Sequence, residues 1–228
     1  MPAPISSGFG FVVVAATLLC ATPAAADEPI SPAESLLFLT NHLDGLPLGT
    51  VLSYGYAKTG TLEPAREDKV RVELARSAGD GAASVHVEFL TGTQRLELPD
   101  VAAANGNPVI LFFLERDVRQ MQRITGGQAA YFRKRVRLAL AEAAEISPVQ
   151  FDFGGRSVSG KQIVVRPYRA DPMRTRFEQL ADKTYIFTLS DQIPGGVYRL
   201  QTTARSPKSR DDAPVLIEET VTLVQVQP

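Results

Sequence analysis

Alternating apolar and polar residues predict β-strands along much of this chain. In one such segment, Val70, Val72 and Leu74 would share one face, with Arg71 and Glu73 on the other. A period of two is typical of an antiparallel strand that packs one face on a core. The same pattern predicts strands over residues 50–57, 69–75, 84–90, 93–98, 149–153, 162–167, 184–190, 197–204 and 215–226.

Two segments carry the residues that begin and end helices. Ser-Pro-Ala-Glu at 31–34 supplies a capping residue, a proline for the first position and the glutamate of a capping box, which predicts a helix over 32–43. Asn-Pro at 107–108 and Gly-Gly after residue 125 bound a longer helix over 108–125. At 1.5 Å per residue, this second helix would span about 27 Å.

The segment Tyr131 to Leu140 fits either a strand or a helix. As a strand, it gathers Phe132, Val136, Leu138 and Leu140 on one face, opposite Arg133, Arg135 and Arg137. As a helix, it mixes apolar and basic residues on both sides. The clean separation favours the strand.

The order of these elements predicts an α+β fold. Runs of consecutive strands with few helices indicate antiparallel sheet. We expect a curved, mainly antiparallel sheet, a half-barrel or open barrel, packed against the long amphipathic helix 108–125 and two shorter helices, the last starting at Asp171. No change in composition divides residues 27–228, which therefore predict a single domain.

The first 26 residues predict a secretory signal peptide. An apolar stretch from Phe9 to Ala21 is followed by three alanines at 24–26, which suit signal peptidase. The alternative is a short membrane anchor, because no Lys or Arg precedes the stretch. Cys20 could be lipidated, but Leu19 before it is larger than a lipoprotein signal prefers. We expect cleavage after residue 26 and a periplasmic location.

Composition excludes several functions. Across 228 residues, 24 basic and 25 acidic side chains give a net charge of −1, which argues against a nucleic-acid binder. One Cys excludes a disulfide scaffold and any zinc or iron–sulfur site that needs several cysteines, and two His argue against a His-rich metal centre. His86 and Glu88 could form half a metal site, but no third ligand is evident. The sequence predicts no metal, no cofactor and no catalytic residue.

The region 115–137 is strongly basic, with seven basic and two acidic residues and a local charge of +5. At 100° per residue, Arg116, Arg119 and Arg123 form a stripe on the helix 108–125, and Phe112 lies one turn before it. The opposite side of the helix is apolar and carries Ile110, Leu111, Leu114, Val118 and Met121.

Arginine suits phosphate and carboxylate because its planar fork binds both groups bidentately. A basic amphipathic helix also suits an anionic membrane surface. The commoner alternative is a solvated helix face with salt bridges to acidic residues such as Glu63, Glu67 and Asp68. The candidate residues for a ligand or an anionic surface are Phe112, Arg116, Arg119, Arg123, Arg133, Arg135 and Arg137.

Three segments, 131–137, 185–190 and 194–198, look like signatures of exported proteins. Together with the N-terminal helix and the long antiparallel sheet, the chain resembles the periplasmic lipoprotein-carrier superfamily of LolA-, LolB- and LppX-like half-barrels over about residues 30–226. The resemblance implies a hydrophobic groove between sheet and helices that holds acyl chains. It implies no catalytic residue.

These observations lead to three hypotheses of function. The first is a periplasmic, non-enzymatic protein that binds or shuttles a lipid or other hydrophobic ligand, with the groove between the concave sheet and helix 108–125. The second is an interaction or assembly factor that docks an acidic protein partner through residues 115–137. The third is an enzyme with a carboxylate-based site, which would require two convergent carboxylates in a cleft.

Overall fold

The computed structural model describes residues 29–76, 83–102, 106–207 and 214–228. The signal peptide predicted for residues 1–26, with Cys20, lies outside these ranges. Nine strands form one antiparallel sheet in the order β4-β3-β2-β1-β9-β8-β7-β6-β5. Their bounds are β1 Val51–Thr59, β2 Arg66–Arg76, β3 Ala83–Phe89, β4 Val101–Ala102, β5 Glu145–Phe153, β6 Arg156–Val165, β7 Thr184–Leu189, β8 Val197–Arg205 and β9 Val215–Gln227.

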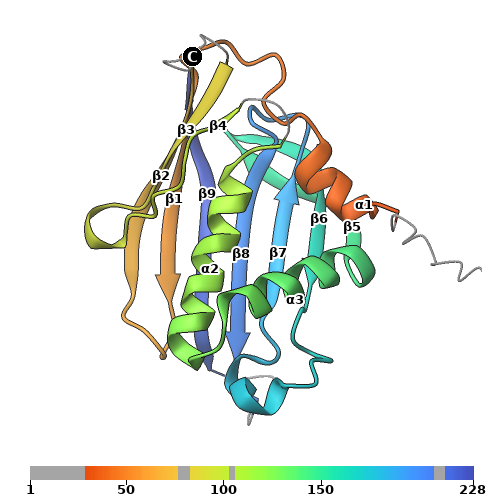
Figure 1. Ribbon diagram of the computed structural model, residues 1–228. Coiled ribbons are helices and arrows are strands. Elements are labelled where there is room, and N and C mark those ends of the chain that lie inside the picture. Colours follow the sequence, from red (N-terminus) through yellow and green to blue (C-terminus); the bar gives the residue numbers. More distant parts are fainter. Residues whose placement is uncertain (1–28, 77–82, 103–105, 208–213) are drawn as a thin grey trace, which may run out of the picture.

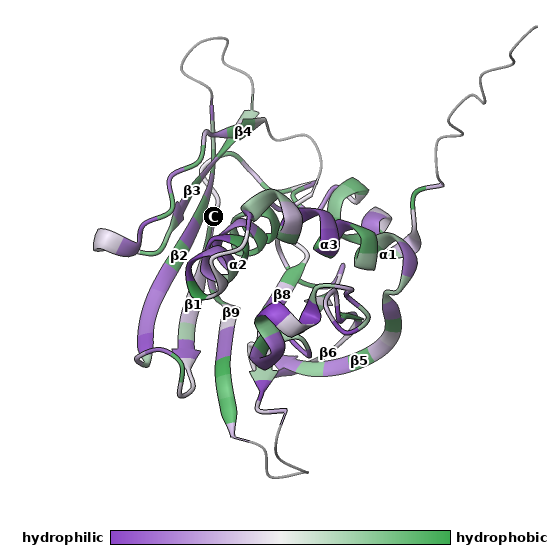
Figure 2. Cartoon of the chain, turned by 60° about the horizontal axis from the view of Figure 1, so that its bottom comes forward, coloured by the Kyte–Doolittle hydropathy of each residue, from purple (hydrophilic) through white to green (hydrophobic). Residues whose placement is uncertain are grey.

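The first strand, β1, pairs with the last, β9, in the middle of the sheet. In β1 and β9, Tyr56 lies opposite Val221 and Tyr54 opposite Leu223. The sheet curves around the helices without closing, and its edges are β4 and β5 (Figures 1 and 2). This is the α+β class with a curved antiparallel sheet that the alternation of residues predicts.

Two helices, α2 (Val109–Thr125) and α3 (Ala129–Glu142), lie over the concave face of the sheet (Figure 1). A short helical segment precedes β1 and consists of α1 (Pro32–Glu34) and the π-helix η1 (Ser35–Leu39). The 3₁₀ helices are η2 (Gly92–Gln94) and η3 (Arg174–Leu180). Among the helices that the structure describes, none is long and apolar enough to cross a membrane.

The first helix begins as predicted and ends early. The Ser31 hydroxyl accepts the Glu34 N–H at 3.1 Å, and the Ser31 N–H donates to the Glu34 carboxylate at 3.0 Å, which forms the capping box. The helix ends at Leu39 and not at residue 43. The Thr40 N–H bonds to the Ser35 carbonyl in a π-turn, Thr40 itself is extended, and a turn follows at residues 42–45.

The strand predicted over residues 131–140 is wrong, because these residues lie in helix α3. Phe132, Val136, Ala139 and Leu140 are all buried, and their spacing of four, three and one is that of a single helix face. The segment holds one β-branched residue, Val136, among arginines, leucines and alanine, which favour helices. The alternation of arginines therefore does not reflect which side of the segment is buried.

The strand predicted over residues 93–98 is also wrong. Leu90 has a φ of 66°, which turns the chain out of β3, and η2 follows directly. Leu96 makes only an isolated bridge to Phe89. The short strand β4 then pairs with β3 through Val101, so this edge of the sheet is only two residues long.

Helix α2 does not divide into an apolar and a basic side as the sequence predicts. Arg116, Asp117 and Gln120 are buried, whereas Leu111 is 49% exposed. The first half of the buried side is apolar, and there Phe112 stacks on Phe89 of β3 with ring centroids 6.0 Å apart. The second half of that side buries the polar residues Arg116, Asp117 and Gln120 as well as Val118 and Met121.

Candidate functional site

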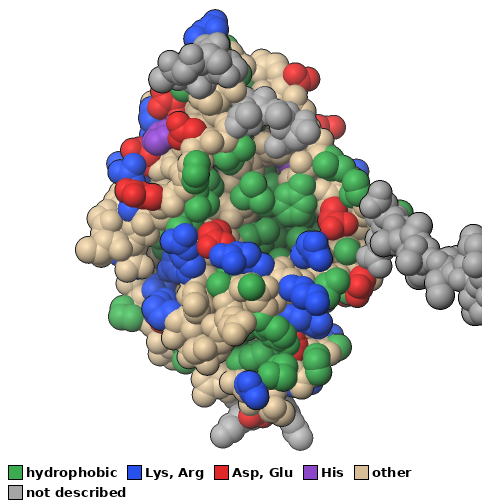
Figure 3. Space-filling view, in the orientation of Figure 1, with side chains coloured by type: hydrophobic (Ala, Val, Ile, Leu, Met, Phe, Trp, Pro, Cys, Tyr) green, Lys and Arg blue, Asp and Glu red, His purple; other side chains and the backbone are tan. Residues whose placement is uncertain are grey.

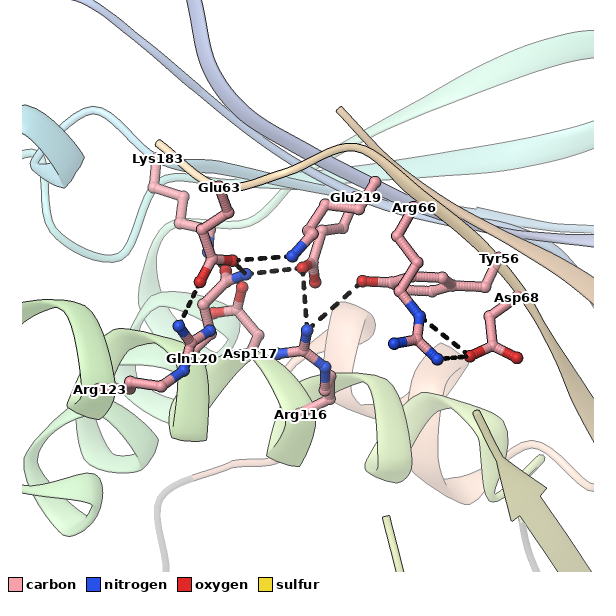
Figure 4. A network of polar contacts seen from close by, with 11 residues as sticks. Tyr56, Glu63, Arg66, Asp68, Arg116, Asp117, Gln120, Arg123, Lys183 and Glu219 are labelled. Atoms are coloured by element: carbon pink, nitrogen blue, oxygen red, sulfur yellow. Dashed lines mark hydrogen bonds and ion pairs between the residues drawn. The ribbon is translucent and has the colours of Figure 1, made fainter. Parts of the chain in front are cut away.

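The interface between the second half of α2 and the sheet holds a group of buried polar side chains (Figure 4). Asp117, Gln120, Lys183 and Glu219 are all at most 1% exposed. We call this group the polar network, and it comprises Tyr56, Lys58, Glu63, Arg116, Asp117, Gln120, Arg123, Lys183, Tyr185 and Glu219.

One part of the polar network surrounds Asp117 of α2. The Lys183 ammonium donates to one oxygen of this carboxylate, and the Tyr185 hydroxyl donates to the other. Lys183 also donates to the Gln120 side-chain oxygen at 3.0 Å. Burial, and then the nearby Asp117 charge, raise the pKa of Tyr185, so its hydroxyl keeps its proton and acts as a donor.

A second part surrounds Glu219 of β9. Its carboxylate accepts from the Gln120 amide at 2.6 Å and from the Arg116 guanidinium at 3.3 Å. Arg116 also lies 3.5 Å from the Tyr56 hydroxyl. Gln120 therefore joins both parts of the network, through its oxygen to Lys183 and through its nitrogen to Glu219.

The third carboxylate, Glu63, lies in the loop between β1 and β2. It accepts from Lys58 and Gln120, each at 3.1 Å, and from Arg123. Burial alone would raise the pKa of Glu63, but the hydrogen bonds from Arg123 and Lys58 outweigh it and lower the pKa to about 2. All three carboxylates of the network are thus occupied by donors from this chain.

The polar network fastens α2 to the sheet. Carboxylates converge here, as the enzyme hypothesis requires, but each is engaged by a cation and by at least one further donor. In the described part of the chain, no group of three His, Cys, Asp or Glu side chains is placed to hold a metal ion. The arrangement joins α2 to the sheet through ion pairs and hydrogen bonds.

A different environment lies among the helices themselves. There, α1, η1, α2 and α3 surround a hollow of about 370 Å³, which we call the helix hollow. Its apolar lining consists of Phe38, Leu111, Leu114, Val118, Val136 and Leu140. Figure 3 shows the hydrophobic side chains gathered over these helices, with Lys and Arg side chains along one side of them.

Charged side chains line the rim of the helix hollow. Glu115 accepts from Arg133 through both Nε and Nη2, each at 2.9 Å, and from Arg119 at 3.1 Å. The hydrogen bonds from Arg133 hold the pKa of Glu115 below its ordinary value despite its partial burial, and Arg119 adds to the effect. The other two rim residues are Glu34 of α1 and Arg137 of α3.

The residues predicted as a binding site lie in different environments. Phe112 is 2% exposed and belongs to the core, and Arg116 belongs to the polar network. Arg123 is exposed but pairs with Glu63. Arg135 lies 2.7 Å from the buried carboxylate of Asp171, below α3. None of these four lines the helix hollow.

Three of the predicted arginines do lie around the hollow. Arg133 and Arg137 line it, and Arg119 shares Glu115 with Arg133. Arg137 is exposed, and it has no hydrogen bond or ion pair to any residue that the structure describes. Arg119 in the middle of α2 and Arg133 and Arg137, one helical turn apart in α3, therefore form a basic side of the helix hollow.

Another cleft, of about 840 Å³, opens at the other end of the sheet. It lies between residues 40–46 and 189–196, and both apolar and polar side chains line it. The Nδ1 of His42, on its wall, accepts the Asn107 N–H at 3.1 Å. Burial lowers the pKa of His42 and favours the neutral ring that this hydrogen bond needs. His42 thus has a structural role at the start of α2.

The sequence analysis did not predict most of the polar network, although two of its carboxylates stand at positions where the pattern predicts core residues. Glu219 stands in phase with Ile217 and Val221 in β9, so the alternation places it on the core face. Asp117 likewise lies one helical turn after Phe113. A charged residue in a core position predicts a buried partner of opposite charge, but alternation alone does not identify that partner.

Comparisons with known proteins give a distant likeness to a solved structure. No family model and no curated protein matches the chain. A search of solved structures matches the crystal structure of the Mycobacterium tuberculosis lipoprotein LppX with a TM-score of 0.34 and 8% sequence identity, over 82% of this chain and 91% of that one. A likeness this distant carries no argument about function, so the superfamily resemblance remains a proposal.

Proposed function

We propose that this protein binds and shuttles a lipid or other hydrophobic ligand, without catalysis, and that the ligand's apolar part lies in the helix hollow. The observation that carries this proposal is the hollow itself. Six apolar side chains line one open space, and Leu111 in its wall is 49% exposed. An open apolar concavity of this kind is a typical ligand site.

The size of the helix hollow limits the ligand. Its volume of about 370 Å³ lies near the lower end of the roughly 300–1,000 Å³ of known ligand sites. This space suits one acyl chain or one small apolar molecule and is too small for a lipid with several long chains. The interface between α2 and the sheet, where the family resemblance would place the ligand, is occupied by core side chains and the polar network.

The location in this proposal rests on the sequence. The apolar stretch from Phe9 to Ala21 and the alanines at 24–26 suit an exported precursor that is cleaved after residue 26. The mature protein would be a single domain from residue 27 to residue 228 in the periplasm. A carrier in that compartment would move a hydrophobic molecule through water between membranes.

Docking of an acidic partner through residues 115–137 has less support. Five of the seven basic side chains there lie within ion-pair distance of Glu63, Glu115, Asp171 or Glu219 of this chain. These contacts neutralise much of the local charge of +5. The same pairing weakens the case for docking on an anionic membrane surface.

The direct test is native mass spectrometry of the protein purified without detergent from a periplasm. We expect a stoichiometric apolar molecule that solvent extraction releases. Leu111→Glu places a charge in the hollow and should abolish co-purification, whereas Leu48→Glu, at a leucine that is 44% exposed elsewhere, should not. A bare mass for the wild-type protein, with no uptake of an added apolar probe, would contradict the proposal.

A further inference from the structure

The basic side of the helix hollow has a charge that this chain does not neutralise. Glu115 is shared by two arginines, Arg119 and Arg133, so that group has an excess of one positive charge. Arg137 adds a second positive charge, with no partner among the residues that the structure describes. Glu34 is the other carboxylate that lines the hollow, and its Oε2 accepts the Ser31 N–H. Three arginines and two glutamates therefore leave a net charge of +1 on this side.

The guanidinium groups on this side differ in their availability. Both Nε and Nη2 of Arg133 are engaged by Glu115 at 2.9 Å, which is a bidentate pair. Arg137 follows Arg133 by one helical turn, on the same side of α3. Its guanidinium is exposed and free to form a bidentate pair with an incoming anion.

We propose that the ligand is a single-chain amphiphile with an anionic head group, whose chain lies in the helix hollow and whose head binds Arg137. This inference rests on the proposed function and adds the chemical class of the ligand. The volume of about 370 Å³ offers room for a single chain. The net positive charge at the rim favours an anionic head group, and the planar guanidinium of Arg137 suits a carboxylate or a phosphate.

The test compares two probes that share one chain. cis-Parinaric acid is a fluorescent long-chain carboxylate, and its methyl ester has the same chain without the charge. We expect the wild-type protein at pH 7.5 to bind the acid about tenfold more tightly than the ester, because hydrogen bonds between charged groups contribute at least this factor. Rising salt should weaken binding of the acid more than binding of the ester.

Two variants of α3 locate the head group. Arg137→Gln should weaken binding of the acid about tenfold and leave binding of the ester unchanged, because only the acid loses a charged partner. Lys134→Gln removes an exposed charge from the same helix away from the hollow, and it should change neither affinity. Palmitate and hexadecyl phosphate, as competitors of the acid, tell a carboxylate head from a phosphate head.

The outcomes separate this inference from the proposed function. Equal affinity for acid and ester, or an Arg137→Gln variant that binds the acid as wild type does, would overturn the anionic head group while a hydrophobic ligand stands. Displacement by neither palmitate nor hexadecyl phosphate would also overturn it. Failure of the wild-type protein to bind either probe, or binding that Leu111→Glu leaves intact, would instead overturn the hollow as the ligand site.

Discussion

Two neighbouring residues of α2 lie in opposite environments. Phe112 is 2% exposed and stacks on Phe89, in the interface between the helix and the sheet. Leu111 is 49% exposed and lines the helix hollow on the other side of the same helix. The interface is occupied by side chains of this protein, while the hollow offers apolar surface that nothing in the described chain covers.

This difference shows that an apolar helix side does not by itself indicate a ligand groove. The sequence places the groove between α2 and the concave sheet, where the structure has core packing and ion pairs. The open apolar space instead lies where α1 with η1, α2 and α3 meet without filling the gap, and this is where we propose the ligand. α3 is essential to that space, since Val136 and Leu140 form part of its wall.

Truncation of the two neighbours gives the largest expected contrast. Phe112→Ala should lower the free energy of unfolding by about 3–5 kcal/mol, because it leaves a cavity in the core. Leu111→Ala should change it by no more than about 0.5 kcal/mol, as is usual for exposed positions. Urea denaturation of both variants checks the contrast, and equal losses would show that the two sides of α2 pack alike.

Breaking the polar network tests the interface at its charged end. Lys183→Met leaves the Asp117 carboxylate buried without its cation and should cost about 3–5 kcal/mol. The double variant Lys183→Met with Asp117→Leu removes both charges and should recover most of that loss. A single variant as stable as wild type in urea would mean that the pair does not fasten α2.

Acid should weaken the same interface through Glu63. The pKa of this carboxyl is about 2 in the folded protein against an ordinary value of 4.5, so its contribution is present above pH 4.5 and is lost as the pH falls towards 2. Glu63→Gln should cost on the order of 2 kcal/mol at pH 7 and flatten this part of the acid profile. Glu97→Gln, at a side chain that is 83% exposed, is the matched control.

The smallest expected effect concerns His42, at the start of α2. Its pKa is lowered in the folded state, so the unfolded chain takes up the proton first, and stability should fall as the pH drops below about 6.5. Denaturation at pH 7.5 and pH 5.5 measures this. His42→Asn keeps an acceptor for the Asn107 N–H and should lose that part of the pH dependence, which His86→Asn should retain.

The sequence predicts the sheet better than the helices. In β1, β2 and β9, alternation reports burial directly, because each strand has one face on the core and one in solvent. Alternation gives the wrong prediction for residues 131–140, because arginines at every second position resemble the polar face of a strand although the segment is helical. The four buried residues of α3 follow the helical period. That period distinguishes helix from strand only when it is known which residues pack against the core.

The candidate site was less predictable than the fold. The basic character of residues 115–137 is visible in the sequence, but the burial of Arg116 beside Glu219 joins residues 103 positions apart. The helix hollow depends on how α1, α2 and α3 meet, which no local pattern specifies. Of the predicted residues, Arg133 and Arg137 line the hollow. The others belong to the core or pair with Glu219, Glu115, Glu63 or Asp171.

Photo-crosslinking with a long-chain alkyl diazirine tests the central claim most directly, because it reports where an apolar chain lies. The account predicts that adducts, mapped by peptide mass spectrometry, fall within residues 111–118 and 133–140 and disappear in Leu111→Glu. Adducts confined to the cleft between residues 40–46 and 189–196, or adducts that Leu111→Glu leaves unchanged, would contradict the helix hollow as the ligand site.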